Sequence, residues 1–390
     1  MSKYLLTTIL SLLNFCFYAQ DFKSDNVRYQ TISWNDFFKK LDQNPKLFYY
    51  DIRSEAERND SIKAAPYNQG KIKGAIETDF ADFAKHYPEY LKHKNDTIYL
   101  YCSHSKRSRY LAKQLRDSSF LHVVNINGGL SYFNTLSESE MPYKNKYYTN
   151  SLKYKLTSPS DFTKALKDKN CQIVDVRPDS LYYGKANIER ANSFGIIKSA
   201  LHLPYNKIKD HLKLLDKNKT ILVIDNEGTL SPIAANYLIE NGYKTSVLLF
   251  GIENLTRTIP ANDRPFLKTK YQMILPEELA NLSKKKNTII IDIRTEPEYN
   301  STSKDGWKNV GKLKNAVSIP LQTLSKEKMT AYNGKNIVLY DMMMKEDVYE
   351  FAKRLKEFGI KDFQILVGGI NQLKEGIYDY QKIELKSLLD

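Results

Sequence analysis

Short apolar runs recur along the chain in the same order three times. The first run of each segment ends in Asp-x-Arg, the second follows about fifty residues later, and the third runs into glycine. Asp51, Asp175 and Asp292, the aspartates of the three Asp-x-Arg motifs, are spaced about 120 residues apart. Apolar runs of this length between turn residues predict buried strands. The runs are 48–53, 97–101 and 123–129 in the first segment, 173–177, 220–224 and 247–251 in the second, and 289–294, 336–340 and 365–369 in the third.

Helical patterns alternate with these strands. Ser33 opens a Ser-x-x-Asp box, and Pro159 and Pro276 stand at first helical positions in the other two segments. After the second strand of each segment, apolar residues recur at helical spacing, as Leu111 and Leu115 do in the first. Strands that alternate with helices predict βα units on a parallel sheet with both faces covered. The expected fold is therefore α/β, with three tandem domains that each hold a small parallel sheet flanked by helices.

The N-terminal segment has the layout of a targeting sequence. Lys3 supplies a positive charge, residues 5–18 are almost uncharged and apolar, and Ala19 is a small residue at a plausible cleavage point. This pattern predicts a secretory signal peptide over residues 1–19 and an exported protein, either periplasmic or secreted. A lipoprotein attached through Cys16 is an alternative that the bulky Phe15 before it disfavours.

The remaining chain is expected to form three domains, over 20–148, 149–262 and 263–390. The lysine- and tyrosine-rich stretch 144–154 and the proline-containing stretch 257–271 are interpreted as linkers. No segment after the signal peptide is apolar over a length that would span a bilayer.

Composition narrows the choice of partners and cofactors. The net charge is +14 and 42% of residues are apolar, so the chain can bury cores and its surface is basic. The lysines are scattered rather than gathered into a stripe, which favours a solvated surface over a nucleic-acid interface. Only Cys102 and Cys171 remain after export, too few for a disulfide scaffold, and the histidines do not fall into zinc-ligand spacing with them. No metal or cofactor is expected.

The loop after the second strand of the first segment carries the candidate chemistry. It reads Cys102-Ser-His-Ser-Lys-Arg-Ser108 and leads from a strand end into a helix. Backbone N–H groups of such a turn, the helix terminus and the basic residues Lys106 and Arg107 all stabilise an anion, so Cys102 is placed to react as a thiolate. Cys171 opens an apolar run and is interpreted as a structural residue, with a disulfide to Cys102 as the alternative.

The Asp-x-Arg strand, the Cys-x-x-x-x-Arg-Ser loop and the Gly-Gly after the third strand resemble the rhodanese (thiosulfate sulfurtransferase) family. The resemblance implies that Cys102 is a nucleophile that carries a sulfane sulfur as a persulfide and that Arg107 binds an anionic donor. Four residues between Cys and Arg favour sulfur transfer over phosphatase chemistry. The resemblance further implies a loop of Ser103, His104, Ser105, Lys106 and Ser108 around the sulfur, with Asp51, Arg53 and Gly129 as structural residues.

The sequence departs from that family at several positions. Ser105 stands where glycine is common, and if this residue needs a positive φ the serine costs about 1 kcal/mol or more. Asp225 and Asp341 replace the cysteine in the second and third segments, where Leu230 and Glu346 replace the arginine. These two domains are expected to be inactive and to serve structure or to bind a protein partner.

The sequence thus predicts an exported sulfurtransferase that moves sulfur from a small anionic donor to a thiol or cyanide through Cys102. The alternatives are a non-catalytic scaffold on the same fold and a phosphatase or redox-sensing thiol. His104 is interpreted as a residue of the pocket rim, with a general-base role as the alternative.

Overall fold

The computed structural model describes residues 29–61, 65–378, 380 and 382–390. The predicted signal peptide over 1–19, together with Cys16, lies outside these residues. The chain divides into two compact units, and their boundary falls between Lys270 and Tyr271. Among the helices of the described residues, none has the length and apolar character that crossing a membrane requires.

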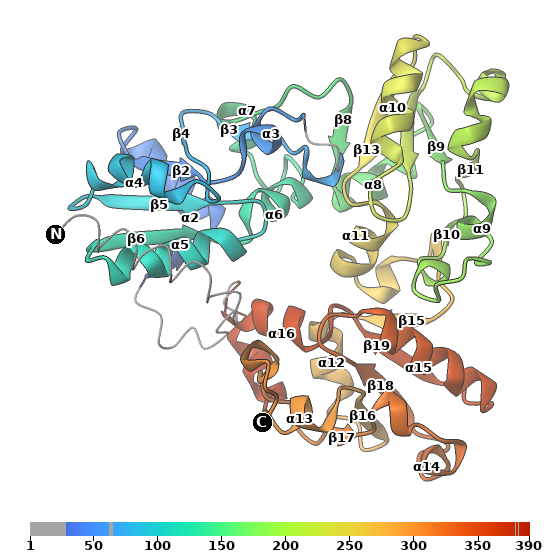
Figure 1. The fold of residues 1–390 in the computed structure, drawn as a ribbon. Helices are drawn as coiled ribbons and strands as arrows, with labels where there is room; N and C mark the ends of the chain where they lie inside the picture. Colours follow the sequence, from blue (N-terminus) through green and yellow to red (C-terminus); the bar gives the residue numbers. More distant parts are fainter. Residues whose placement is uncertain (1–28, 62–64, 379, 381) are drawn as a thin grey trace. The chain divides into compact units, whose positions relative to one another are not determined.

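Each third of the described chain forms one five-stranded sheet, and all neighbouring strands in the three sheets are parallel. The strand orders are β1-β6-β5-β2-β4, β8-β13-β12-β9-β11 and β15-β19-β18-β16-β17, which are the same order three times. Helices cover both faces of every sheet (Figure 1). The predicted α/β fold with three parallel sheets is therefore confirmed. We refer to residues 29–149, 150–270 and 271–390 as the first, second and third repeats.

The first repeat places its central strand β5 between β6 and β2. Its strands are β1 (Gln30–Ile32), β2 (Phe48–Asp51), β3 (Lys71–Ile72), β4 (Ile76–Glu77), β5 (Thr97–Tyr101), β6 (His122–Ile126) and β7 (Tyr148–Thr149). Its helices are α2 (Trp34–Gln43), α3 (Glu55–Arg58), α4 (Phe83–Leu91), α5 (Lys106–Asp117), α6 (Gly129–Thr135) and α7 (Lys144–Tyr147), with a 3-10 turn, η2, at Ala65–Tyr67.

The second repeat follows the same plan. Its strands are β8 (Lys155–Thr157), β9 (Cys171–Asp175), β10 (Ile196–Ile197), β11 (Leu201–His202), β12 (Thr220–Ile224), β13 (Lys244–Leu248) and β14 (Leu267–Lys268). Its helices are α8 (Pro159–Ala165), α9 (Asp179–Tyr182), α10 (Ser231–Glu240) and α11 (Gly251–Thr258), with 3-10 segments η3 (Ala191–Ser193), η4 (Tyr205–Leu214) and η5 (Ala261–Asp263).

The third repeat forms the second compact unit. Its strands are β15 (Gln272–Ile274), β16 (Thr288–Asp292), β17 (Val317–Ser318), β18 (Asn336–Tyr340) and β19 (Phe363–Leu366). Its helices are α12 (Pro276–Leu282), α13 (Glu296–Tyr299), α14 (Lys326–Thr330), α15 (Glu346–Glu357) and α16 (Gly369–Tyr378), with 3-10 segments η6 (Gly306–Lys308), η7 (Leu321–Thr323) and η8 (Ile383–Leu388).

Apolar side chains on the two faces of the first sheet form two separate cores. Trp34 and other aromatic residues of α2 pack with α6 on one face, while α4 and α5 cover the other. Trp34 is almost fully buried, and its indole N–H donates to the Gly129 carbonyl oxygen at 2.9 Å. The helix that precedes β2 therefore supports the start of α6, which lies next to the Cys102 loop.

The helix starts match the sequence signals. The Ser33 hydroxyl accepts the backbone N–H of Asp36 at 3.1 Å and caps α2. Ser158 caps α8 in the same way through the N–H of Asp161, also at 3.1 Å, with Pro159 in the first turn. These caps satisfy helix N–H groups that have no partner inside the helix.

The stretches interpreted as linkers carry secondary structure of their own. In the first, β7 pairs antiparallel with β3, and in the second, β14 pairs antiparallel with β10. Each of these short ladders holds a connecting segment against the repeat that it follows, so the ends of the first and second repeats are pinned by backbone hydrogen bonds.

Candidate active site in the first repeat

Cys102 is the first residue after β5, the central strand of its sheet, and only 1% of it is exposed. The helix α5 begins at Lys106, so the cysteine lies between the carboxyl end of a parallel strand and a helix N-terminus. This edge of a parallel α/β sheet is where ligands bind. The structure thus places the predicted nucleophile where the sequence puts it, and its chemical role stays a prediction.

Backbone bonds fix the direction of the loop. The N–H groups of Leu130 and Ser131 donate to the carbonyl oxygens of Cys102 and Ser103, each at 2.9 Å. A Cβ at Gly129 would lie 2.5 Å from both of these oxygens, so no larger residue fits between α6 and the loop. With its first two carbonyls turned toward α6, the loop is free to turn its later N–H groups toward the Cys102 side chain.

Ser105 adopts the left-handed conformation that the sequence analysis treated as a risk. Its φ is 65°, and the residues at the same position in the other repeats, Gly228 and Met344, have φ of 81° and 59°. For a residue with a Cβ this conformation costs about 1–2 kcal/mol. The Ser105 hydroxyl donates to the Ile126 carbonyl oxygen at 3.2 Å, which helps to hold the turn. Serine therefore takes the same loop shape as glycine, at a cost in strain.

Ser108 brings its hydroxyl to the sulfur. Its oxygen lies 3.6 Å from the Cys102 Sγ, 3.2 Å from the Ser105 carbonyl oxygen and 2.7 Å from the Asn125 side-chain oxygen. Asn125 is fully buried on β6 and was missed by sequence reasoning. The available signal was a polar residue inside an otherwise apolar strand, at a position where the other repeats have Val247 and Ile365.

Arg107 is held by a carboxylate that sequence reasoning also missed. Its guanidinium donates to both carboxylate oxygens of Glu57, at 2.8 and 2.7 Å, and to the Ser103 hydroxyl at 3.0 Å. Glu57 lies on α3 and is only 5% exposed. The Ser54 backbone N–H also donates to this carboxylate, at 3.1 Å, as part of a capping box. The predicted anion-binding arginine is therefore engaged in a two-pronged ion pair.

The pair keeps both of its members charged. Desolvation acts to raise the pKa of Glu57, but the hydrogen bonds and charge of Arg107 outweigh it, and the pKa lies below its ordinary value. Desolvation likewise opposes the charge on Arg107, yet its bonds with Glu57 and the proximity of Cys102 raise its pKa. At neutral pH the two charges cancel within the loop.

His104 is held in its neutral form. Its Nε2 lies 3.0 Å from the Ser131 hydroxyl. Although the residue is exposed by surface area, desolvation of the ring and the nearby Arg107 charge lower the pKa of His104 to about 4. The ring is therefore uncharged at neutral pH and adds no cation to the site. Lys106 is exposed at the first position of α5.

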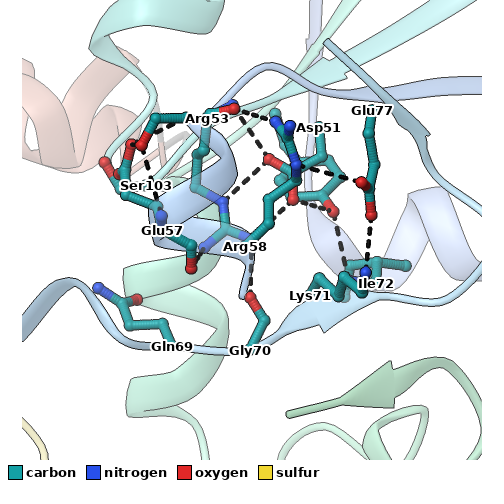
Figure 2. Close-up of polar contacts among 12 residues, drawn as sticks. Asp51, Arg53, Glu57, Arg58, Gln69, Gly70, Lys71, Ile72, Glu77 and Ser103 are labelled. Atoms are coloured by element: carbon teal, nitrogen blue, oxygen red, sulfur yellow. Dashed lines mark hydrogen bonds and ion pairs between the residues drawn. The ribbon is translucent and has the colours of Figure 1, made fainter. Parts of the chain in front are cut away.

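The Asp-x-Arg motif of the first repeat forms a buried brace of polar contacts (Figure 2). Arg53 donates to both carboxylate oxygens of Asp51, at 2.9 and 2.6 Å, and to the Gly70 carbonyl oxygen at 2.7 Å. The Tyr101 hydroxyl donates to Asp51 at 2.9 Å. Arg177 and Arg294 make the same ion pair with Asp175 and Asp292, each at 2.6 Å. The same ion pair occurs in the two repeats that lack the cysteine. Its geometry therefore fits a structural role rather than a catalytic one.

Comparison with known protein families assigns the fold to a family. The model of the rhodanese-like domain matches three times, over residues 35–136, 158–257 and 275–375. The chain belongs to the rhodanese family. Membership supports a function related to sulfur transfer. No curated protein matches the chain in sequence.

Several solved structures are similar to the chain, with low TM-scores. A thiosulfate sulfurtransferase from Pseudomonas aeruginosa is 16% identical, with 87% of this chain and 66% of that one covered and a TM-score of 0.24. A protein from Staphylococcus saprophyticus is 26% identical over 26% of this chain and 92% of its own, with a TM-score of 0.22. EanB in complex with ergothioneine is 12% identical, with 90% and 98% covered and a TM-score of 0.28.

The second and third rhodanese-like repeats fill the loop with a carboxylate. Asp225 accepts the backbone N–H groups of Gly228, Leu230 at 2.5 Å and Ser231 at 2.9 Å. In the third repeat Asp341 accepts those of Met344 at 2.5 Å and Lys345 at 2.8 Å. Burial raises the pKa of Asp225, and it raises that of Asp341 to about 6. Each aspartate thus occupies an anion site built from loop amides.

The amides that bind Asp225 have equivalents in the first rhodanese-like repeat. The residues equivalent to Gly228, Leu230 and Ser231 are Ser105, Arg107 and Ser108. Because the three loops share the same carbonyl bonds to the following helix and the same left-handed turn, we expect amides of the Cys102 loop to face the Cys102 side chain as well.

Proposed function

We propose that the chain is an exported sulfurtransferase in which Cys102 carries a sulfane sulfur between a thiosulfate-like donor and a thiol or cyanide. The observation that carries the proposal is the loop itself. Its equivalents hold a carboxylate with two or three backbone N–H groups, and in the first repeat a cysteine stands at that point. An array of amides that holds a carboxylate also stabilises a thiolate or a persulfide anion.

The reaction would follow from nucleophilic attack in two steps. The Cys102 thiolate attacks the outer sulfur of thiosulfate, the sulfur–sulfur bond of the donor breaks, and sulfite leaves with the electron pair. Cys102 is then a persulfide anion. A thiol or cyanide attacks its terminal sulfur, the bond between the two sulfurs breaks, and the Cys102 thiolate is restored.

Turnover by the purified mature chain tests the proposal. Thiosulfate and cyanide should give thiocyanate and sulfite, and mass spectrometry should find one added sulfur atom on the peptide that contains Cys102. Cyanide should remove this sulfur. A wild-type protein that takes up no sulfur from thiosulfate, polysulfide or an organic thiosulfonate would refute the proposal.

A scaffold function is the second candidate, and the self-occupied loops favour it for two of the three repeats. Asp225 and Asp341 satisfy the amides that an exogenous anion would use, so the second and third repeats offer surfaces rather than anion sites. In the scaffold alternative, Cys102→Ser would leave the biological activity of the chain unchanged, whereas sulfur transfer requires that substitution to abolish it.

Export is part of the proposal and rests on the apolar stretch over residues 5–18. The mature chain should begin near Gln20 and lie in the periplasm or outside the cell. N-terminal sequencing of the native protein checks this, and an intact Met1 in a cytosolic fraction would contradict it.

A further inference from the structure

Three arginines near the candidate active site are each paired with a carboxylate. Arg53 pairs with Asp51 at 2.6 Å and Arg107 with Glu57 at 2.7 Å. Arg58 is 3.4 Å from Glu77. Arg107 is the one of these that belongs to the Cys102 loop, and Glu57 engages its guanidinium with both carboxylate oxygens.

Glu57 and Arg107 are both replaced in the second repeat. Six residues after the aspartate of Asp-x-Arg, the second repeat has Leu181 in place of Glu57, and its loop has Leu230 in place of Arg107. The second repeat has therefore lost both charges of the pair.

The third repeat keeps one carboxylate and redirects it. Glu298 stands at the Glu57 position, and Glu346 replaces the arginine. Glu298 pairs instead with Lys308 at 3.0 Å. The loop arginine thus occurs in the repeat where a buried carboxylate faces it, and in the third repeat, where Glu346 replaces the arginine, the carboxylate pairs with Lys308 instead.

The pairing sets the charge that a donor meets near Cys102. Glu57 and Arg107 cancel, and His104 is neutral at neutral pH. Within the Cys102 loop, which the structure describes in full, the positive contributions that remain are the partial charge of the α5 N-terminus and Lys106, which is exposed and screened by solvent. One negative charge suits such a site, while a second one on the donor meets no buried cation of the loop that is not already paired, and only the solvent-screened Lys106 remains.

We propose that Glu57 is a specificity-determining residue that makes the site select sulfane-sulfur donors with a single negative charge, such as organic thiosulfonates or alkyl persulfides, over the thiosulfate dianion. The inference rests on the proposed sulfur transfer and names its donor class.

Both donor classes lead to the same intermediate. With a thiosulfonate anion, the Cys102 thiolate attacks the terminal sulfur, the sulfur–sulfur bond breaks, and a sulfinate leaves with the electron pair. With thiosulfate the leaving group is sulfite, which carries one more negative charge. The two reactions therefore differ in charge at the group that faces the Glu57–Arg107 pair, and not in the bond that is formed.

A double-mutant cycle, assayed with thiosulfate and with methanethiosulfonate, tests the proposal. Methanethiosulfonate has a methyl group in place of one anionic oxygen of thiosulfate. The measured quantity is the ratio of kcat/KM for thiosulfate to kcat/KM for methanethiosulfonate. Glu57→Leu exposes the Arg107 charge and should raise this ratio by about tenfold or more, and Arg107→Leu should lower it similarly. The double variant, which reproduces the second repeat's leucines, should return the ratio to within about threefold of the wild type.

Matched variants guard against a folding artefact. Glu57→Gln removes the charge with little change in shape and should shift the ratio in the same direction as Glu57→Leu. Glu77→Gln breaks the Arg58 pair, which lies outside the Cys102 loop, and should leave the ratio unchanged. An unchanged ratio in Glu57→Leu, Glu57→Gln and Arg107→Leu would overturn the proposal.

An alkylation experiment separates this proposal from the proposed function. Iodoacetate and iodoacetamide differ by one negative charge, and both label Cys102 without turnover. The ratio of the iodoacetate rate to the iodoacetamide rate should rise in Glu57→Leu and fall in Arg107→Leu. If it does so in a protein that takes up no sulfur, the sulfurtransferase function fails while the charge assignment stands. If sulfur is transferred but neither ratio responds, the charge assignment fails alone.

Discussion

The Ser108 hydroxyl oxygen lies 3.6 Å from the Cys102 sulfur. The Asn125 amide oxygen lies 2.7 Å from the same hydroxyl oxygen and competes with the sulfur for the single hydroxyl proton of Ser108. In this orientation Asn125 Nδ2 is buried and has no hydrogen-bond partner among the residues that the structure describes. Turning the amide over lets Nδ2 donate to Ser108 and frees the hydroxyl proton for a Cys102 thiolate. Ser108 therefore has the geometry of a donor to the anionic sulfur.

Ser108→Ala is expected to slow sulfur uptake by about tenfold or more, since a hydrogen bond to a charged group contributes about 1.5–3 kcal/mol. Ser108→Thr keeps the hydroxyl and should retain most of the rate. Single-turnover persulfide formation followed by mass spectrometry measures both. An alanine variant that reacts at the wild-type rate would show that Ser108 does not assist Cys102.

The two cysteines of the described chain should behave differently toward a sulfur donor. Desolvation and the nearby Asp168 raise the pKa of Cys171, so its thiol stays protonated at neutral pH. Cys102→Ser should abolish both the sulfur adduct and turnover, and Cys171→Ser should spare them. Peptide mass spectrometry after incubation with thiosulfate or methanethiosulfonate locates the adduct, and labelling at Cys171 alone would contradict the assignment.

The left-handed turn at Ser105 gives a prediction about stability. Both Ser105→Ala and Ser105→Gly lose the hydrogen bond to the Ile126 carbonyl, but glycine also relieves the strain of a positive φ. The glycine variant should therefore be more stable than the alanine variant by about 1 kcal/mol. Urea unfolding compares the two, and equal midpoints would show that the turn is unstrained.

Restoring a cysteine should not restore activity in the other repeats. Asp225→Cys in a Cys102→Ser background leaves Leu230 at the arginine position, and Asp341→Cys faces Glu346, which repels an anion. Neither single substitution should yield thiocyanate from thiosulfate and cyanide. Turnover by either variant would mean that the amides of the loop suffice without a cation.

The buried Asp341 carboxyl should make the third repeat less stable as the pH rises. Burial raises its folded pKa to about 6, above the ordinary value of 3.8, so the folded state binds more protons between these values. The stabilisation from its protonated form is complete below pH 3.8 and is lost as the pH rises through about 6, amounting to about 1–3 kcal/mol. Hydrogen exchange across β18 and α15 at pH 4.5 and 7 measures the change. Asp341→Asn should remove this pH dependence of the exchange rates. A variant with the same pH dependence as the wild type would contradict the assignment to Asp341.

The parts of the fold that could be predicted from the sequence are those specified by local sequence patterns. The long central strands, the helix caps at Ser33 and Ser158 and the loop at Cys102 all follow from patterns within a few residues. The short strands at the two edges of each sheet had no such signal. The edge strands β1, β8 and β15 have three residues each, and β4, β11 and β17 have two, so alternation cannot reveal them.

The site was less predictable than the fold because its contacts join distant residues. Glu57 lies fifty residues before Arg107 and, from the sequence, is typical of an acidic residue at a helix start, which it also is. Asn125 reads as an interruption of a strand until β6 places it beside Ser108. The resemblance assigned an anion-binding role to Arg107, and only the fold shows that a carboxylate of the same chain already holds it.

The contact between α6 and the Cys102 loop has an evolutionary consequence. In every repeat two helix N–H groups hold the first two loop carbonyls, and a glycine lets the backbones meet. None of these bonds involves the side chain at the cysteine position, so the shape of the loop does not depend on its chemistry. A duplicated copy can therefore carry cysteine or aspartate at this position and still fold, so the residue that decides the chemistry is free to change without loss of the fold.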